Sequence, residues 1–457
     1  MKFYFENLGL LDSAELNLSD LTIICGENNT GKTYATYAVY GFLRSWKVLL
    51  RNVMISEISS MEHSKEKYQI NLEEVFGGKI NEYLNKLGHE FQTVLNEAFA
   101  AKEDAFIDTK IRVSIEKELD VFKKPYQRRV QGGNSILATI TKEADSPILE
   151  LLSADIESRL GAFGLIEFVI DAIAEIVFSP YFPNPHISSA ERTGAAIFRR
   201  ELDMARTRML KAINEMDSKE IRNRPWKLLQ SIDTDYAWPV EDNVEFVRQL
   251  EDIDKQTSEL VKEHPEILIA FDEIIGGSYK VIRDQGLVFQ AKGTKNRRYT
   301  MNEASSCARA LLDVGFYLRC RAKPGDLFII DEPELNLHPK NQRAFARLIA
   351  QLVNSGIKVF MTTHSDYLIK ELNTLIMLNQ QTDHTKVVQE KYGYSKDELL
   401  NCNNIVLYFT EKAGKRKKQN ILRQAKIYPD LGIEVTTFDD TIDLMNNIQN
   451  DLVYGGE

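Results

Sequence analysis

A short run near the start of the chain has the pattern of a phosphate-binding loop. Gly26 is followed by four residues and then by Gly31, Lys32 and Thr33, the glycines, lysine and hydroxyl in the order that this pattern requires. An apolar run, Leu21 to Cys25, precedes the loop, and apolar residues at helical spacing follow it. In a strand–loop–helix unit, backbone N–H groups and the positive end of the helix dipole face phosphate oxygens. The alternative is a tight turn that binds nothing.

The phosphate-loop interpretation gives each of these residues a role. The Lys32 ammonium would reach the β- and γ-phosphates, and the Thr33 hydroxyl would ligate Mg²⁺. Gly26 and Gly31 let the backbone bend toward the phosphates. The remaining residues expected to line the nucleotide are Asn28, Asn29 and Thr30. We therefore expect ATP and Mg²⁺ as cofactors.

A second group of acids stands far along the chain, after another apolar run. Leu327 to Ile330 predicts a buried strand that ends at Asp331 and Glu332. Asp331 would hold the magnesium through its water shell, and Glu332 would orient or deprotonate an attacking water. Alone, a strand ending in two acids is as well explained by a solvated strand end. Together with the loop at Gly26, it indicates an ATPase site.

Two further motifs carry a resemblance to a known family. The run Asp331-Glu-Pro-Glu-Leu-Asn-Leu-His338-Pro339 resembles the Walker B strand and following loop of ABC-type ATPase heads in the OLD and RecF-like group. Thr362-Thr-His364-Ser365 resembles the switch region of those heads, in which a histidine contacts the γ-phosphate. The resemblance implies that His364 acts with Glu332 in catalysis. Taken alone, His364 would be interpreted as a strand-end histidine with local hydrogen bonds.

Two segments match that family only in part. Ser305 and Ser306 stand where such ATPases carry their signature motif, but Cys307 replaces the expected glycine. The resemblance implies that these serines bind the γ-phosphate of nucleotide held by a second subunit, whereas a serine helix cap is the simpler alternative. The segment Ser188 to Gly194 resembles one that leads out of the insertion of these heads. Arg192 is a candidate site residue there, and a helix cap at Ser188 or Ser189 is an equal alternative.

The same resemblance suggests partners and a biological role. Heads of this kind act as a homodimer or higher homo-oligomer, and standalone OLD-like ATPases serve bacterial antiphage defence with a separate effector protein, a nuclease or another toxin. The stretch after residue 378 is too short for the toprim domain of OLD nucleases, so we expect no nuclease activity in this chain. The alternatives are a RecF- or SMC-like DNA-clamp or repair ATPase and a nucleotide-binding scaffold that hardly hydrolyses ATP.

The charge balance makes broad DNA binding unfavourable. The 457 residues are 43% hydrophobic and 27% charged, with a formal net charge of −10 at pH 7. An acidic surface repels nucleic acid, so DNA binding would need a local basic patch. The run Lys415 to Lys418 is one candidate, although a solvated loop is the commoner explanation.

Several features indicate a cytoplasmic protein with no membrane contact. The N-terminus lacks the apolar block of a secretory signal. The most apolar stretch, Leu160 to Phe178, carries Glu167, Asp171 and Glu175 at a spacing of four, which is typical of an amphipathic surface helix. The cysteines and histidines lack the spacings of a zinc site or a disulfide framework.

The predicted fold is α/β: an ABC-type P-loop ATPase head with a mainly parallel core sheet, an antiparallel N-terminal lobe and a large helical insertion. Leu327–Ile330 and Lys358–Thr362, separated by a helix at about 340–352, have the spacing of a βαβ unit. The expected divisions are 1–50 (head, N-terminal half), 51–180 (helical insertion), 181–300 (strand, helical arm and hairpin), 301–378 (head, C-terminal half) and 379–457 (C-terminal α/β tail).

Overall fold

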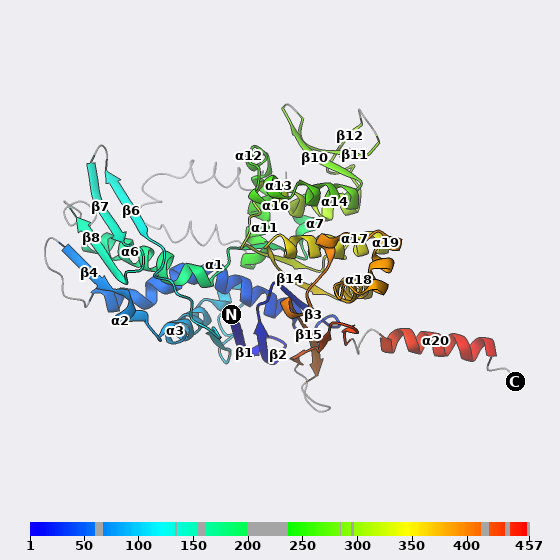
Figure 1. Ribbon diagram of the computed structural model, residues 1–457, viewed down its shortest axis with the longest axis horizontal. Coiled ribbons are helices and arrows are strands. Elements are labelled where there is room, and N and C mark those ends of the chain that lie inside the picture. Colours follow the sequence, from blue (N-terminus) through cyan, green and yellow to red (C-terminus); the bar gives the residue numbers. More distant parts are fainter. Residues whose placement is uncertain are drawn as a thin grey trace. The chain divides into compact units, whose positions relative to one another are not determined.

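The computed structural model describes residues 1–59, 67–132, 135–153, 161–198, 236–283, 285–293, 297–412, 420–434 and 439–454 (Figure 1). The chain forms two compact units. The first holds Met1–Asn17, Ala38–Asn96 and Lys102–Pro185, and the second holds Leu18–Tyr37, Glu97–Ala101 and His186–Glu457. Helix α1 (Lys32–Ser59) begins in the second unit and continues into the first.

The second unit is built around a sheet with the strand order β16-β15-β3-β14-β13-β9. Strands β15, β3, β14 and β13 run parallel, and β16 is antiparallel to β15. Their bounds are β3 Leu21–Cys25, β9 Pro185–Ser188, β13 Leu327–Asp331, β14 Lys358–Thr363, β15 Ile405–Lys412 and β16 Asn420–Gln424. The predicted α/β fold with a mainly parallel core sheet is confirmed.

Continuous apolar sequence explains why these strands lie at the centre of the unit. Every residue of β3 and of β13 is buried, as expected for parallel strands that are covered on both faces. Phe328 of β13 belongs to one core cluster with Phe316 and Phe345 from the surrounding helices. Burying a phenylalanine of this size contributes about 1.5–3 kcal/mol to folding.

Helices and a small antiparallel sheet complete the second unit. The helix predicted at about 340–352 is α17 (Pro339–Asn354), and the predicted hairpin is β10 (Gly277–Ile282) with β11 (Gly286–Ala291), joined by β12 (Arg298–Thr300). The other helices are α7 Arg192–Ile197, α11 Trp238–Arg248, α12 Leu250–Ile253, α13 Glu259–Glu263, α14 Pro265–Ile275, α15 Ser306–Ala310, α16 Leu312–Cys320, α18 Asp366–Leu378, α19 Asp383–Tyr392 and α20 Asp439–Tyr454. The hairpin turn at Asp284 and the basic run Lys415–Lys418 lie outside the described residues.

The insertion at residues 51–180, predicted to be mostly helical, also contains a four-stranded antiparallel sheet, which corrects that prediction. An antiparallel sheet of order β5-β1-β2 confirms the N-terminal lobe, with β1 Lys2–Leu8, β2 Leu11–Asn17 and β5 Lys110–Ser114. A second antiparallel sheet has the order β4-β8-β7-β6, with β4 Lys67–Asn71, β6 Tyr126–Gly132, β7 Ser135–Lys142 and β8 Ile148–Ser153. Helix α2 is Leu72–Phe76 and helix α3 is Ile80–Thr93. The alternation that marks a strand is brief in this sheet: in β7, buried Ala138 and Ile140 alternate with threonines.

The amphipathic helix expected at Leu160–Phe178 is confirmed. It comprises α6 (Gly161–Ile173) and a π-helical turn, Ala174–Phe178. Two acids of its polar stripe have partners: Asp171 accepts from Arg51 at 2.7 Å, and Glu175 accepts from the Tyr126 hydroxyl at 2.6 Å. Across the described residues, every helix is too short or too polar to cross a bilayer.

His186 is an ionisable side chain held among aromatic rings at the start of β9. Its ring stacks on Tyr317 with centroids 4.1 Å apart and meets Phe246 edge-on at 4.7 Å. Part of the residue is accessible, but its Nε2 is buried without a hydrogen-bond partner among the described residues. Burial, reinforced by the charge of Arg321, lowers the pKa of His186 to about 3. The ring is therefore neutral in the folded protein at ordinary pH.

Replacing His186 with phenylalanine is expected to make folding less sensitive to acid. A pKa that is depressed in the folded state gives stability that is present above the unfolded-state pKa, about 6.5, and lost as pH falls. Between about pH 7.5 and pH 5.5 the wild type should lose about 1.4 kcal/mol more unfolding free energy than His186→Phe. Urea unfolding at both values measures this, with exposed His89→Phe as the control. Equal losses in wild type and His186→Phe would contradict the assignment.

Candidate nucleotide and catalytic site

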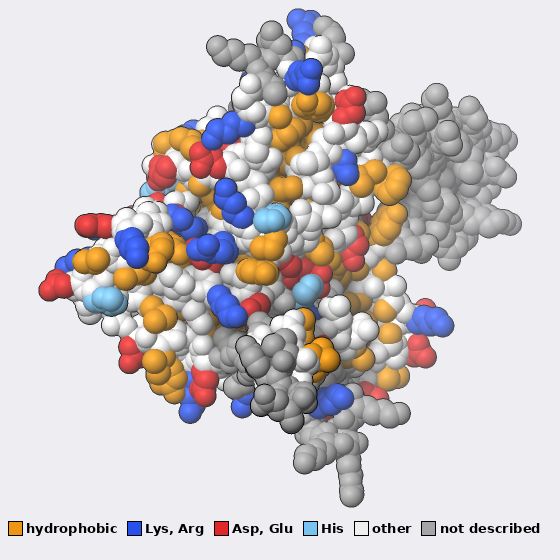
Figure 2. Space-filling model, turned by 90° about the vertical axis from the view of Figure 1, so that its right-hand side faces the viewer, with side chains coloured by type: hydrophobic (Ala, Val, Ile, Leu, Met, Phe, Trp, Pro, Cys, Tyr) orange, Lys and Arg blue, Asp and Glu red, His pale blue; other side chains and the backbone are white. Residues whose placement is uncertain are grey.

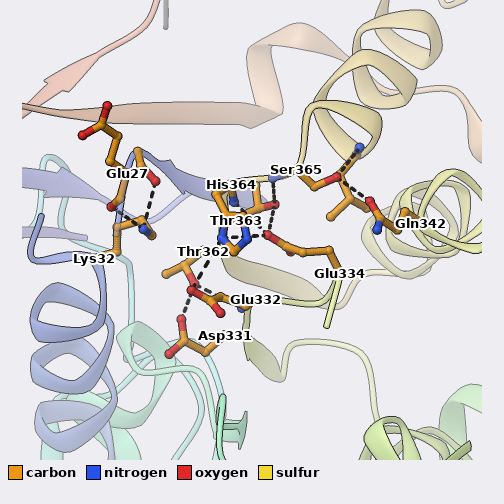
Figure 3. A network of polar contacts seen from close by, with 12 residues as sticks. Glu27, Lys32, Asp331, Glu332, Glu334, Gln342, Thr362, Thr363, His364 and Ser365 are labelled. Carbon is orange, nitrogen blue, oxygen red and sulfur yellow. Dashed lines mark hydrogen bonds and ion pairs between the residues drawn. The ribbon is translucent and has the colours of Figure 1, made fainter. Parts of the chain in front are cut away.

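Parallel pairing brings the predicted site residues to one edge of the second unit's sheet. Strand β14 pairs Thr363 with Cys25 of β3 and Thr362 with Asp331 of β13. The loops that follow these strands therefore leave the sheet at the same edge. Figure 3 shows Lys32 and the two acids Asp331 and Glu332 gathered there with His364.

The loop from Gly26 to Thr33 has the backbone shape that its glycines predict. Gly26 has φ 152°, Gly31 has φ 102°, and Asn29 between them has φ 60°. Residues other than glycine, and to a smaller extent asparagine, are strained at positive φ. Both glycines are therefore required. Asn28, Asn29 and Thr33 are exposed on the loop, as access to a ligand requires.

Lys32 is buried and turned back onto its own loop. Its ammonium donates to the carbonyl of Gly26 at 2.9 Å and to that of Glu27 at 2.7 Å. Burial lowers the pKa of Lys32, while the charges of Glu332 and Asp331 act in the opposite direction. The lysine that should bind phosphate is thus held in place by loop carbonyls and by the acids across the site.

Asp331 is buried at the end of β13 and accepts a hydrogen bond from the Thr362 hydroxyl. Burial raises the pKa of Asp331 to about 6; the Thr362 hydrogen bond and Arg192 oppose this, and the charges of Glu332 and Glu191 add to it. A carboxylate crowded by other acids is a favourable position for a cation. Asp331 therefore suits the predicted magnesium role.

Glu332 has a left-handed backbone conformation, with φ 49°. Its N–H donates to the carbonyl of Thr362 at 3.2 Å, and Thr362 Oγ1 also accepts it at 3.2 Å. Its carboxylate lies 3.6 Å from Nδ1 of His364, so the two predicted catalytic residues face each other. Strained backbone held by neighbours is common at functional sites.

His364 is held on its other side by Glu334, a buried acid that received no role in the sequence analysis. Glu334 Oε1 accepts from the Thr363 hydroxyl at 2.9 Å and from the His364 N–H at 2.8 Å, and it lies 3.3 Å from His364 Nδ1. Two carboxylates near Nδ1 favour the tautomer that carries its proton there. Glu334 thus fixes the backbone and the ring of His364.

Arg192 is fully buried and donates hydrogen bonds to the backbone of the acid pair. Its guanidinium donates to the carbonyls of Asp331 at 2.6 Å, Glu332 at 2.8 Å and Ala310 at 2.8 Å. The same group also contacts the carbonyl of Ser189 at 3.0 Å. Arg192, which the sequence offered as a candidate site residue, therefore lies at the site and holds the backbone of the acid pair.

Ser305 and Ser306 are not brought to the phosphate loop of their own chain by any hydrogen bond among the described residues. Ser305 is the N-cap of α15 and accepts from the Ala308 N–H at 3.2 Å, as the simpler alternative predicted. Both serines are exposed. Cys307 contacts the carbonyl of Ile274 through sulfur at 3.8 Å, so it faces the neighbouring helix.

The donors at the edge fit a magnesium ion that is held largely by a nucleotide. In the described part of the chain, acids, histidines and cysteines form no group of three that would bind a metal alone. Mg²⁺ usually keeps several waters and takes one or two protein oxygens beside substrate phosphates. The Asp331 carboxylate and the Thr33 hydroxyl supply oxygens of that kind.

Two other residues at the site were missed by sequence reasoning. Glu191 accepts from the Tyr37 hydroxyl at 3.1 Å, and its charge contributes to the raised pKa of Asp331. Thr410, on the C-terminal strand β15, reaches the phosphate loop. Glu191 stands beside Arg192 in a segment already considered, whereas no local pattern marks Thr410.

Comparison with known proteins identifies a family for most of the chain. The family model AAA_15, described as "AAA ATPase domain", matches residues 1–369. No curated protein matches the sequence.

Solved SMC heads show a weak structural likeness. An SMC head bound to the C-winged helix domain of ScpA has 13% identity and a TM-score of 0.35, covering 96% of this chain and 98% of its own. The SMC head domain from Thermotoga maritima has 11% identity and a TM-score of 0.33, with 93% and 98% covered. Similarities at this level carry no argument about function.

Replacing Glu334 with glutamine is expected to slow ATP turnover about tenfold, because the ring of His364 loses the nearer of its two carboxylate partners while the acceptor oxygen remains. The ATP dissociation constant should stay within about twofold, since among the described residues Glu334 makes no hydrogen bond or ion pair with the phosphate loop and its charge acts only weakly on Lys32. Steady-state turnover and equilibrium ATP binding measure the two quantities separately. Glu390→Gln on α19 is an exposed control. A variant with wild-type turnover would show that the charge of Glu334 is not needed for catalysis.

Proposed function

Because this chain belongs to the AAA ATPase domain family, we propose that it binds ATP with Mg²⁺ and hydrolyses it at the sheet edge of the second unit. One observation carries the proposal. A buried lysine on a phosphate-type loop, a buried aspartate, and a glutamate 3.6 Å from a histidine lie at the ends of adjacent parallel strands. These are the groups that phosphate binding, metal binding and water activation require.

Each side chain has one task in this mechanism. Lys32, held by the carbonyls of Gly26 and Glu27, directs the third N–H donor of its ammonium to phosphate oxygens at the start of α1. Asp331 and Thr33 would hold a magnesium ion, which would neutralise phosphate charge. Glu332 takes a proton from the attacking water, with His364 keeping its carboxylate in position. Arg192 fixes the carbonyls of both acids so that the carboxylates keep their spacing.

We also propose that the site is completed by a second copy of the chain. The exposure of Ser305 and Ser306 supports this, because hydroxyls on the surface are available to nucleotide on another protomer. In the resembling ABC-type heads, this motif acts in that way. The functional unit would then be at least a homodimer.

The biological role that we propose is a nucleotide-dependent switch for a separate effector protein in antiphage defence. The resemblance of Asp331–Pro339 to OLD-like ATPases supports it. The net charge of −10 disfavours DNA as the main ligand, and on the face drawn in Figure 2 acidic and basic side chains are intermixed. ATP turnover that rises with added duplex DNA would instead favour a DNA-clamp or repair ATPase.

Replacing Glu332 with glutamine is expected to lower ATP turnover at least a hundredfold and to leave ATP binding intact. The amide cannot take a proton from water, although it occupies the same space. An ATP-bound dimer should then persist, which size-exclusion chromatography with light scattering detects in ATP and Mg²⁺. Glu390→Gln is again the control. Unchanged turnover in Glu332→Gln would remove Glu332 from catalysis, and a wild type that binds no ATP would overturn the proposed function.

A mixing experiment tests completion of the site by the second copy. Lys32→Ala protomers lack a working phosphate loop but keep Ser306, whereas Ser306→Arg protomers have the opposite defect. Each variant alone should be inactive. If the site is shared, mixed dimers contain one intact pair of halves, and about a quarter of wild-type turnover should return by statistical assortment. A mixture that stays inactive, or a Ser306→Arg variant with full activity, would contradict a shared site.

A further inference from the structure

The phosphate loop has a neighbour from a part of the chain that lies beyond the family match. Strand β15 (Ile405–Lys412) runs parallel to β3 and pairs Phe409 with Cys25. The next residue, Thr410, therefore stands beside the start of the loop at Gly26. The AAA ATPase domain model ends at residue 369, so this strand belongs to the segment that we expected to be a tail.

A chain of hydrogen bonds connects the Thr410 hydroxyl, through Thr30, to the Glu27 carbonyl that holds Lys32. The Thr410 hydroxyl lies 2.7 Å from Thr30 Oγ1 and 3.4 Å from the carbonyl of Cys25. Thr30 in turn donates to the carbonyl of Glu27 at 2.7 Å. That carbonyl also accepts from the Lys32 ammonium at 2.7 Å. Since Thr30 gives its only proton to Glu27, its oxygen is left to accept the proton of Thr410.

Gly26 is in very close contact with the same threonine. A Cβ added to Gly26 would lie 1.8 Å from Thr410 Oγ1 and 3.4 Å from Thr30 Oγ1. The glycine is therefore required by β15 as well as by its φ of 152°. Thr410 is buried, with 8% of its surface exposed, so its hydroxyl depends on these partners.

We propose that Thr410 is a positioning residue of the nucleotide site, which orients the Lys32 ammonium through Thr30 and the carbonyl of Glu27. The inference rests on the proposed function, because it concerns the same phosphate-binding lysine. Strand β15 is then part of the nucleotide site. Without the Thr410 hydroxyl, Thr30 and the Glu27 carbonyl are free to turn, and Lys32 loses the carbonyl that aims it.

Substitutions at Thr410 separate this role from simple packing. Thr410→Ala removes the hydroxyl without adding bulk and should weaken ATP binding about fivefold, the effect of one ordinary hydrogen bond. Thr410→Ser keeps the hydroxyl and should bind ATP within about twofold of wild type. Thr139→Ala, at a half-buried strand threonine of the first unit, is the matched control and should not change binding. Titration with a fluorescent ATP analogue in the full-length protein measures all four proteins.

A double substitution tests whether Thr410 acts through Thr30. If the two hydroxyls form one chain, Thr30→Ala combined with Thr410→Ala should weaken ATP binding no more than Thr30→Ala alone. Independent contributions would instead multiply. Circular dichroism melting of each variant identifies any that fails to fold, and Thr410→Ser then decides the role of the hydroxyl.

The outcomes distinguish this inference from the proposed function. Wild-type protein that binds no ATP would overturn both. Wild-type binding with an unchanged Thr410→Ala affinity, or equal losses in Thr410→Ala and Thr410→Ser, would overturn only the role of Thr410. Multiplying losses in the double variant would overturn the connection through Thr30.

Discussion

The hydrogen bonds that β14 makes along both of its edges determine where the candidate catalytic residues lie. On one edge β14 is in register with β3, which leads into the phosphate loop, and on the other with β13, which ends at Asp331. Its own end supplies the contacts between them: Thr362 bonds Asp331, and Thr363 bonds Glu334. A slip of one residue would turn these side chains to the opposite face of the sheet. The site is thus a consequence of strand register.

Behind this edge, a buried polar cluster keeps the acids in place. Arg192 contacts carbonyls from α15 and from the end of β13, so segments that are distant in sequence share one guanidinium. Nearby, the carboxylate of Asp313 accepts from Ser188 at 2.6 Å and from Asn243 at 2.7 Å, and burial raises its pKa. Removing one member would leave buried polar groups without partners, which is costly inside a protein. Arg192 therefore links the helix that carries Ser306 to the backbone of Asp331 and Glu332.

Local patterns predicted the centre of the site, and non-local pairing explains what they missed. The phosphate loop, the strand ending at Asp331 and the strand before His364 each carry a continuous local signal, and the structure places them at one sheet edge. The catalytic and metal-binding roles themselves stay predictions. The four-stranded sheet of the first unit was missed because the alternation in its strands is brief and helical patterns flank it. The position of β15 beside β3 depends on residues almost four hundred positions apart, which no spacing rule reveals.

At Glu332, the left-handed backbone sets the stability of the fold against the proposed activity. An ordinary side chain at φ 49° costs about 1 kcal/mol relative to glycine. Selection for thermal tolerance alone would therefore favour losing the glutamate, because a glycine there would relax the chain. Retaining the carboxylate means accepting a less durable fold, so engineered stabilisation of this enzyme should begin elsewhere, for instance in the sheets of the first unit.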